Sequence, residues 1–181
     1  MTELRLSGGL YRGRRLRVPH GVRPTEGRVR EALFSIWQEE LAGARFLDLF
    51  AGAGAVGLEA LGRGAAAVVL VEGDVRALRT LKENVAALAA DGAARVYRLR
   101  LPPGLGVLRE REMPFDLVFV DPPYGHAGMG SLLVGLGTLL RPGGAVAFEH
   151  ADRDPVPPAP AGLTLEGTRG YGGTCLSLYR T

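Results

Sequence analysis

The chain has 181 residues, of which 46% are hydrophobic and 23% charged, a composition typical of one globular domain. No stretch approaches the ~20 consecutive apolar residues that a membrane span needs, and no apolar signal segment is present at the N-terminus. The single cysteine, Cys175, excludes an internal disulfide, and the three histidines lack metal-ligand spacing, so we expect a cytoplasmic protein without a metal.

Positive charge is concentrated near the N-terminus. The formal net charge is +3, yet residues 1–30 hold eight arginines and two glutamates, so this segment carries +6 and the remainder −3. A basic segment on a mildly acidic body suggests a phosphate-rich partner such as a nucleic acid. A solvated basic face would have the same composition, so charge alone leaves both interpretations open.

Residues 4–18 alternate loosely and contain several glycines, which predicts a short hairpin or extended arm rather than a core element. Apolar residues at helical spacing then predict a helix over 25–42, with Thr25 as its N-cap. We therefore separate a basic arm and helix, residues 1–43, from a single compact unit, residues 44–181. Arginines on the glycine-containing bend of the arm can follow a phosphate backbone, and those at the bend are Arg12, Arg14 and Arg15.

From residue 45 onward, predicted strands alternate with predicted helices. This alternation implies an α/β fold with a mostly parallel sheet and helices on both faces. Two last strands, near 163–168 and 174–180, are expected to form an antiparallel hairpin at the sheet edge, which gives seven strands in all. The other predicted strands cover 46–50, 66–71, 95–99, 115–120 and 145–150, and the helices cover 55–63, 74–88, 104–112 and 128–140.

The segment 46–59 changes from an apolar strand into a glycine-rich turn and then into a helix. Such an arrangement brings backbone N–H groups and a helix N-terminus to one place, where a polar or charged ligand can bind. The glycine spacing is not a full G-x-G-x-x-G, and the lack of G-K-[ST] excludes a P-loop NTPase. The turn residues of interest are Phe50, Ala51, Gly52 and Gly54.

Two carboxylates accompany this turn. Glu72 ends the second strand of the alternation, twenty positions beyond Gly52, where an acid can accept hydrogen bonds from ribose hydroxyls. Asp48 lies inside an apolar strand end, where a carboxylate is costly unless it is paired. It can accept from the backbone of the following turn or face a cationic ligand group. An acidic pocket suits S-adenosylmethionine, which carries a sulfonium and an ammonium, better than it suits a dinucleotide pyrophosphate.

The sharpest chemical signal is Asp121-Pro122-Pro123-Tyr124, which follows another apolar strand. Two prolines hold the backbone extended and remove two donors, so that local carbonyls are left as acceptors. The Asp121 side chain and a free carbonyl can hold both hydrogens of an exocyclic amino group, which favours the tetrahedral nitrogen of a methyl-transfer transition state. Tyr124 can stack on the base. A turn that merely ends a strand explains the prolines but not the flanking Asp and Tyr.

These residues resemble a known family. The sequence DPPY at 121–124 resembles the [DNS]-P-P-[YFW] motif of class I, S-adenosylmethionine-dependent amino-methyltransferases. The wider pattern is similar to the bacterial 16S rRNA guanine-N2 methyltransferases of the RsmD family, and it spans nearly the whole chain in the right order. The segments that carry this resemblance are GRRL at 13–16, RPTEGRVREALF at 23–34, DLFAGAGAVGLEAL at 48–61, DPPY at 121–124 and YGGT at 171–174.

The resemblance implies transfer of a methyl group from S-adenosylmethionine to N2 of one guanine in 16S rRNA, within the 30S subunit or a late assembly intermediate. It implies a Rossmann-like fold, no membrane and no obligate protein partner, and we expect a monomer. The resemblance assigns catalytic roles to Asp121, Pro122, Pro123 and Tyr124. It assigns RNA contacts to Arg12, Arg14, Arg15 and Arg23. The residues assigned to the cofactor site are Asp48, Phe50, Ala51, Gly52, Gly54, Glu72, Thr25 and Arg28.

The chain departs from the family pattern at two places. Glu26-Gly27 stands where the family often has Thr-Asp after Thr25, so an acid is shifted or absent. Arg100 stands where class I enzymes usually place the Asp or Asn that contacts the adenine amine, so adenine recognition is expected to rest on backbone groups and packing.

Other functions remain open at this point. An N6-adenine DNA methyltransferase shares the DPPY motif, but the chain has no sizeable insertion that can read a DNA sequence. A non-catalytic RNA-binding module on the same fold predicts no methyl transfer although Asp121 is present. A dinucleotide oxidoreductase is disfavoured by the DPPY motif and by the missing third glycine of the turn.

Overall fold

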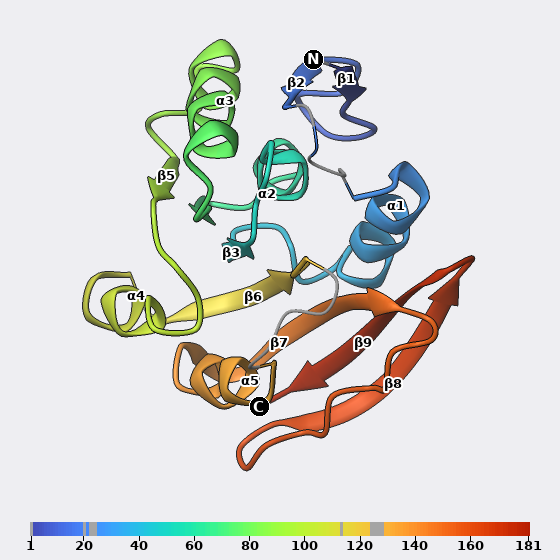
Figure 1. Cartoon of the computed structure of the whole chain (residues 1–181). Helices are drawn as coiled ribbons and strands as arrows, with labels where there is room; N and C mark the ends of the chain where they lie inside the picture. The colour runs from blue at the N-terminus through green and yellow to red at the C-terminus, as the bar shows by residue number, and fades with distance from the viewer. Residues whose placement is uncertain (1, 20, 22–24, 113, 124–128) are drawn as a thin grey trace.

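The computed structural model describes residues 2–19, 21, 25–112, 114–123 and 129–181. Its centre is a seven-stranded sheet in the order β5-β4-β3-β6-β7-β9-β8, in which the first five strands are parallel and β9 and β8 are antiparallel (Figure 1). The predicted α/β class and C-terminal hairpin are confirmed. The strands are β3 (Arg45–Leu49), β4 (Ala67–Val71), β5 (Ala94–Tyr97), β6 (Phe115–Val120), β7 (Leu140–Ala151), β8 (Thr164–Tyr171) and β9 (Thr174–Arg180).

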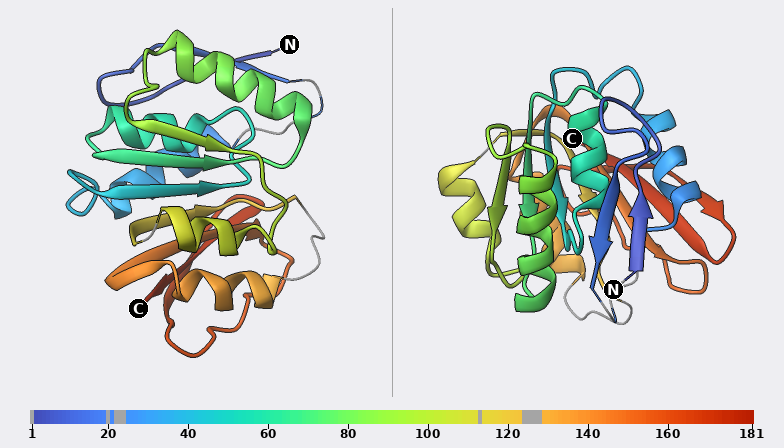
Figure 2. Two further views of the ribbon diagram at one scale, coloured as in Figure 1. Left: turned by 90° about the vertical axis from the view of Figure 1, so that its left-hand side faces the viewer. Right: turned by 90° about the horizontal axis from the view of Figure 1, so that it is seen from above.

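Helices cover both faces of the sheet (Figure 2). One hydrophobic core lies between the sheet and α1, α2 and α3, and the other lies between the sheet and α4 and α5. None of the helices in the described part of the chain has the length and apolarity for crossing a membrane. The helices are α1 (Gly27–Ile36), α2 (Ala55–Gly62), α3 (Val75–Ala87), α4 (Leu105–Arg111) and α5 (Met129–Gly137).

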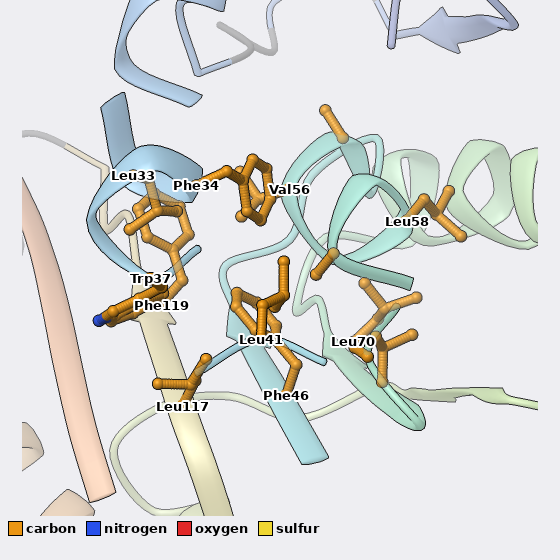
Figure 3. Close-up of a cluster of buried hydrophobic side chains, with 14 of the residues drawn as sticks. Leu33, Phe34, Trp37, Leu41, Phe46, Val56, Leu58, Leu70, Leu117 and Phe119 are labelled. Atoms are coloured by element: carbon orange, nitrogen blue, oxygen red, sulfur yellow. The ribbon is translucent and has the colours of Figure 1, made fainter. Parts of the chain in front are cut away.

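The first core joins α1 to the sheet. Trp37, at the end of α1, and Phe46 of β3 are almost fully buried, with their ring centroids 5.9 Å apart in an edge-to-face arrangement. Figure 3 shows these rings beside Phe119 of β6 and the leucines that surround them. This packing holds α1 against the face of β3 and β6.

The N-terminal strands β1 (Thr2–Arg5) and β2 (Arg15–Val18) form the predicted hairpin. The prediction that it is no core element is wrong, because Leu6 and Leu16 are almost fully buried in the same cluster as Phe46. Asn84 of α3 also accepts from the Arg17 N–H and donates to the Arg17 carbonyl, both at 2.9 Å. Buried apolar and polar contacts therefore attach the hairpin to the compact unit of residues 44–181.

The largest differences from the predicted element boundaries are at α1 and β7. Helix α1 begins at Gly27 with Glu26 as its N-cap, and no side chain caps it, so the prediction of Thr25 as N-cap is wrong. The same helix ends at Ile36, and residues 37–40 form turns. Strand β7 begins at Leu140 rather than at 145, because residues 140–144 continue along β6 through an irregular register.

Candidate active site

A cavity of about 360 Å³ opens at the carboxyl ends of β3, β4, β6 and β7. Its wall contains the glycine-rich turn after β3, Glu72 after β4, and Asp121, Pro122 and Pro123 after β6. Ligands of parallel α/β sheets bind at this end of the strands. The structure thus brings both stretches that the sequence singled out into one cavity. Among the described residues, no group of three or more His, Cys, Asp or Glu side chains is arranged to hold a metal ion.

The glycine-rich turn follows a tight path. Phe50, Gly52 and Gly54 have φ angles of +62°, +55° and +84°, a region that glycine adopts without a steric penalty. A Cβ on Gly54 would lie 2.4 Å from the Cδ1 atom of Leu81 in α3, so the turn also needs glycine for close packing. Phe50 is not a glycine, so its backbone is strained at this positive φ, and the residue lines the cavity. The backbone of Ala51 and Gly52 is left accessible to the cavity.

Hydrogen bonds of Glu72 join this turn to the segment that follows β4. Its Oε2 atom accepts from the Gly52 N–H at 2.8 Å, and its Oε1 atom accepts from the Asp74 N–H at 2.7 Å. Asp74 in turn caps α3 by accepting from the N–H groups of Arg76 and Ala77. A carboxylate oxygen has two lone pairs, so each Glu72 oxygen retains capacity for a donor from the cavity.

Asp48 lies at the base of the cavity and is only 2% exposed. Its Oδ2 atom accepts from the Gly57 N–H at 2.8 Å, so the backbone that pairs this carboxylate belongs to helix α2 rather than to the glycine-rich turn itself. Burial raises the pKa of Asp48 to about 8, against the lowering effect of the Gly57 hydrogen bond, and the charges of Asp121 and Glu72 raise it further. The charges of Asp121 and Glu72 therefore disfavour added negative charge beside Asp48 and favour a cation.

Asp121 receives a hydrogen bond that the sequence did not indicate. The Thr25 hydroxyl, just before α1, donates to the Oδ2 atom of Asp121 at 3.1 Å. The Thr25 carbonyl accepts from the Nη1 atom of Arg30 at 2.7 Å, so the segment before α1 is held at both its backbone and its side chain. One carboxylate oxygen of Asp121 is thereby oriented at the cavity wall.

A buried ion pair supports this segment. Arg30 and Glu59 are 2% and 0% exposed, and the Arg30 Nε atom lies 3.4 Å from the Glu59 Oε2 atom. Glu59 also accepts from the Ser7 hydroxyl at 2.7 Å and from the Arg63 Nη2 atom at 2.7 Å. Burial raises the pKa of Glu59, but the hydrogen bonds from Ser7 and Arg63 outweigh it and hold the pKa below its ordinary value. The network connects the N-terminal hairpin, α1 and α2.

Arg28 and Gly54, which the sequence assigned to the cofactor site, do not line the cavity. Arg28 donates through Nη2 to the Tyr171 carbonyl at 3.0 Å, so its side chain reaches the β8–β9 hairpin rather than the cavity wall. Arg100 is exposed beyond β5. Tyr124 and Arg23 lie outside the described residues.

The arginines of the hairpin bend are exposed, although two of them already have partners. Arg14 donates through Nη2 to the Ala87 carbonyl at 2.6 Å, and Arg15 forms an ion pair of 2.8 Å with Glu3. Both partners of the Arg15 pair are more than half exposed, so the pair contributes about 0–1 kcal/mol and can exchange for a phosphate. Their predicted role in RNA binding stays a prediction.

Sequence reasoning missed one carboxylate of the cavity. Glu149 lines the cavity from the end of β7 and is 8% exposed. The sequence pattern that indicates Glu72, an acid near the carboxyl end of an apolar strand, is also present at Glu149. The Thr25 contact to Asp121, by contrast, joins residues 96 positions apart and has no local signal.

The strand order, the glycine-rich turn after β3 and Asp-Pro-Pro after β6 together define a class I methyltransferase fold. The solved structure of the Escherichia coli protein yhhF superposes on this chain with a TM-score of 0.87 and 34% identity, covering 99% of this chain and 98% of that one. The model of the family described as "Conserved hypothetical protein 95" matches residues 4–180.

Two relatives carry the same name, ribosomal RNA small subunit methyltransferase D. The protein of Haemophilus influenzae is 33% identical over 177 residues, which is 93% of this chain and 90% of that protein. The protein of Escherichia coli K12 is 44% identical over 124 residues, which is 67% of this chain and 61% of that protein. The chain belongs to the RsmD family of rRNA methyltransferases, as its sequence motifs indicated.

Proposed function

We propose that this protein transfers a methyl group from S-adenosylmethionine to the N2 amine of one guanine in 16S rRNA. The observation that carries the proposal is the single cavity in which a buried acid, a glycine-rich turn and the Asp121-Pro122 acceptors meet. Relatives named for methylation of small-subunit rRNA support the choice of RNA.

The residues of the cavity fit the cofactor. S-adenosylmethionine supplies an electrophilic methyl group on a sulfonium, and it carries a second positive charge on its ammonium. The charges of Asp121 and Glu72 favour such a cation, and a bound cation in turn favours the ionised form of the buried Asp48. Glu72 lies beside the turn with acceptor capacity for ribose hydroxyls. The exposed backbone of Gly52 allows a ligand to approach closely.

Asp121 and Pro122 hold the amine that receives the methyl group. The Asp121 carboxylate, oriented by the Thr25 hydroxyl, accepts one N2 hydrogen, and the Pro122 carbonyl accepts the other. These two acceptors favour a tetrahedral nitrogen, whose lone pair is then directed at the methyl donor. Pro123 keeps the backbone extended, and Tyr124 stacks on the base. A guanine must be unpaired or flipped out of its helix to reach the cavity.

The substrate is small-subunit rRNA in the 30S particle or a late assembly intermediate, and the protein acts as a cytoplasmic monomer. The basic hairpin supplies affinity for the RNA backbone through Arg12, Arg14 and Arg15, together with Arg23. Binding that depends on neutralised phosphates weakens steeply with salt.

The decisive experiment incubates the protein with labelled S-adenosylmethionine and, separately, unmodified 30S subunits, naked 16S rRNA and duplex DNA. Label is expected on N2 of a single guanine of the rRNA. Label on adenine N6 of DNA would instead identify a DNA methyltransferase. Absence of label on all three substrates, with RNA binding intact, would identify a non-catalytic binding module.

The role of Asp121 is tested with Asp121→Ala. Loss of the acceptor is expected to lower transfer by a factor of about 100 or more while S-adenosylmethionine still binds. The exposed Asp91→Ala serves as the matched control, because it removes a carboxylate from the loop between α3 and β5. Near-normal turnover of Asp121→Ala contradicts the assignment.

The role of the hairpin is tested by replacing Arg12, Arg14 and Arg15 together with Ala. This variant is expected to bind the particle more weakly and to show a smaller slope of log affinity against log salt. The control removes three exposed arginines that lie outside the hairpin, namely Arg109, Arg111 and Arg153. Equal losses in the two variants would show that total charge, rather than the hairpin, determines affinity.

A further inference from the structure

Glu149 stands beside Asp121 at the same end of the sheet. Strands β6 and β7 are parallel, and the last pair in their register is Val120 with Phe148, so Asp121 and Glu149 are the next residues along the chain on each side. Neighbouring strands are ~4.8 Å apart. Side chains alternate between faces, and both acids lie two residues beyond members of the core beneath α1, namely Phe119 and Ala147.

Both carboxylates face the same cavity. Glu149 and Asp121 line it together with Phe119, which is buried below them. Glu149 is 8% exposed, and burial of a carboxylate is costly unless it serves a polar contact. Carboxylate oxygens accept hydrogen bonds, so this wall of the cavity presents two neighbouring acceptor groups.

The edge of guanine matches these acceptors. Guanine presents an N1–H donor directly beside its N2 amine, so two adjacent ring positions donate. Adenine presents an acceptor nitrogen, N1, beside its N6 amine. In guanine, N2 lies between the N1–H donor and the acceptor N3. With the amine at Asp121 and Pro122, the orientation that turns N1 towards β7 brings this donor to Glu149. A donor there is satisfied by the carboxylate, whereas an acceptor there is repelled by it.

We propose that Glu149 is a specificity-determining residue, which accepts the N1–H of the target guanine and rejects bases whose N1 is an acceptor. This inference rests on the proposed function, because it concerns the base that Asp121 holds. It extends that function by giving a physical reason for guanine over adenine in a cavity whose Asp-Pro-Pro acceptors are equally suited to either amine.

The test uses 2-aminopurine, which keeps the N2 amine, has an acceptor at N1 and lacks O6, so the N1 contact is isolated by the change of preference between wild type and Glu149→Gln. The target nucleotide, once mapped by the label, is replaced in a ligated 16S rRNA that is assembled into 30S subunits. The measured quantity is the ratio of kcat/KM for guanine to kcat/KM for 2-aminopurine. Because both rates come from one protein preparation, the ratio does not depend on the fraction that is folded.

The wild type is expected to favour guanine by a factor of about 10 to 100, the range of one well-placed base contact. In Glu149→Gln the amide can donate to N1 of 2-aminopurine, so the ratio is expected to fall by about tenfold or more. Glu149→Asp keeps the charge and is expected to keep the preference for guanine while lowering the rate. The control Glu110→Gln, at an exposed position of α4, is expected to leave the ratio unchanged.

An unchanged ratio in Glu149→Gln overturns the inference. So does a Glu149→Gln variant that loses only affinity for S-adenosylmethionine, measured by calorimetry, because the carboxylate would then serve the cofactor ammonium. Failure of the proposed function looks different, since the wild type would then methylate no guanine at all.

Discussion

Replacing Asp48 with Asn tests whether the base of the cavity holds a neutral acid. Between pH 4 and 8 the unfolded chain has released the proton of this carboxyl, whereas the folded protein retains it, because burial raises the pKa from 3.8 to about 8. The folded state binds more protons across this window, so its stability falls as the pH rises through it. Each pKa unit corresponds to ~1.4 kcal/mol, which sets a ceiling of about 6 kcal/mol for the whole window.

Asn has the shape of the neutral acid and can still accept from the Gly57 N–H, but it does not ionise. The free energy of unfolding of Asp48→Asn, relative to the wild type, is therefore expected to increase between pH 4.5 and 8.5. Water that enters the cavity reduces the effect below its ceiling, and an increase of at least about 1 kcal/mol is expected.

The assay is urea denaturation of both proteins at several pH values. The free energy of unfolding of the wild type is subtracted from that of Asp48→Asn at each pH, so titration that is common to both proteins cancels. The exposed Asp91→Asn is the control for loss of one carboxylate. A difference between Asp48→Asn and wild type that is constant over the whole pH range would refute the reasoning.

Four further outcomes are expected. S-adenosylmethionine binding near pH 7 should release a proton, because a cation favours the ionised form of the buried acid; calorimetry in buffers of different ionisation enthalpy measures this, and equal heats in all buffers would contradict it. Gly57→Ala would place a Cβ 2.4 Å from the Cδ2 atom of Leu70, so overpacking should cost about 1–3 kcal/mol in thermal unfolding. Glu59→Gln leaves buried Arg30 without its counter-charge and should cost about 3–5 kcal/mol in urea, whereas a loss below 1 kcal/mol would mean that the pair is not isolated from water. Thr25→Val removes the hydroxyl that orients the Asp-Pro-Pro carboxylate, and it should lower kcat by about tenfold with little change in thermal stability; an unaltered kcat would show that this contact is dispensable.

Part of this protein follows from the sequence alone. The alternation of apolar strands with amphipathic helices predicts a parallel sheet, because the period of the pattern decides which residues share a face. The glycine-rich turn and Asp121-Pro122 both follow strands of that sheet, and the carboxyl ends of parallel strands lie at one edge. Their meeting in one cavity could therefore be anticipated without coordinates.

Tertiary structure decided the rest. The burial of Leu6 and Leu16, the pairing of Arg30 with Glu59 and the contact of Thr25 to Asp121 join segments far apart along the chain, and local spacing carries no record of such partners. The high pKa of Asp48 likewise depends on how completely the assembled core excludes water from one carboxylate. The sequence predicted which residues carry the chemistry, and only the packed fold decided how they are oriented and charged.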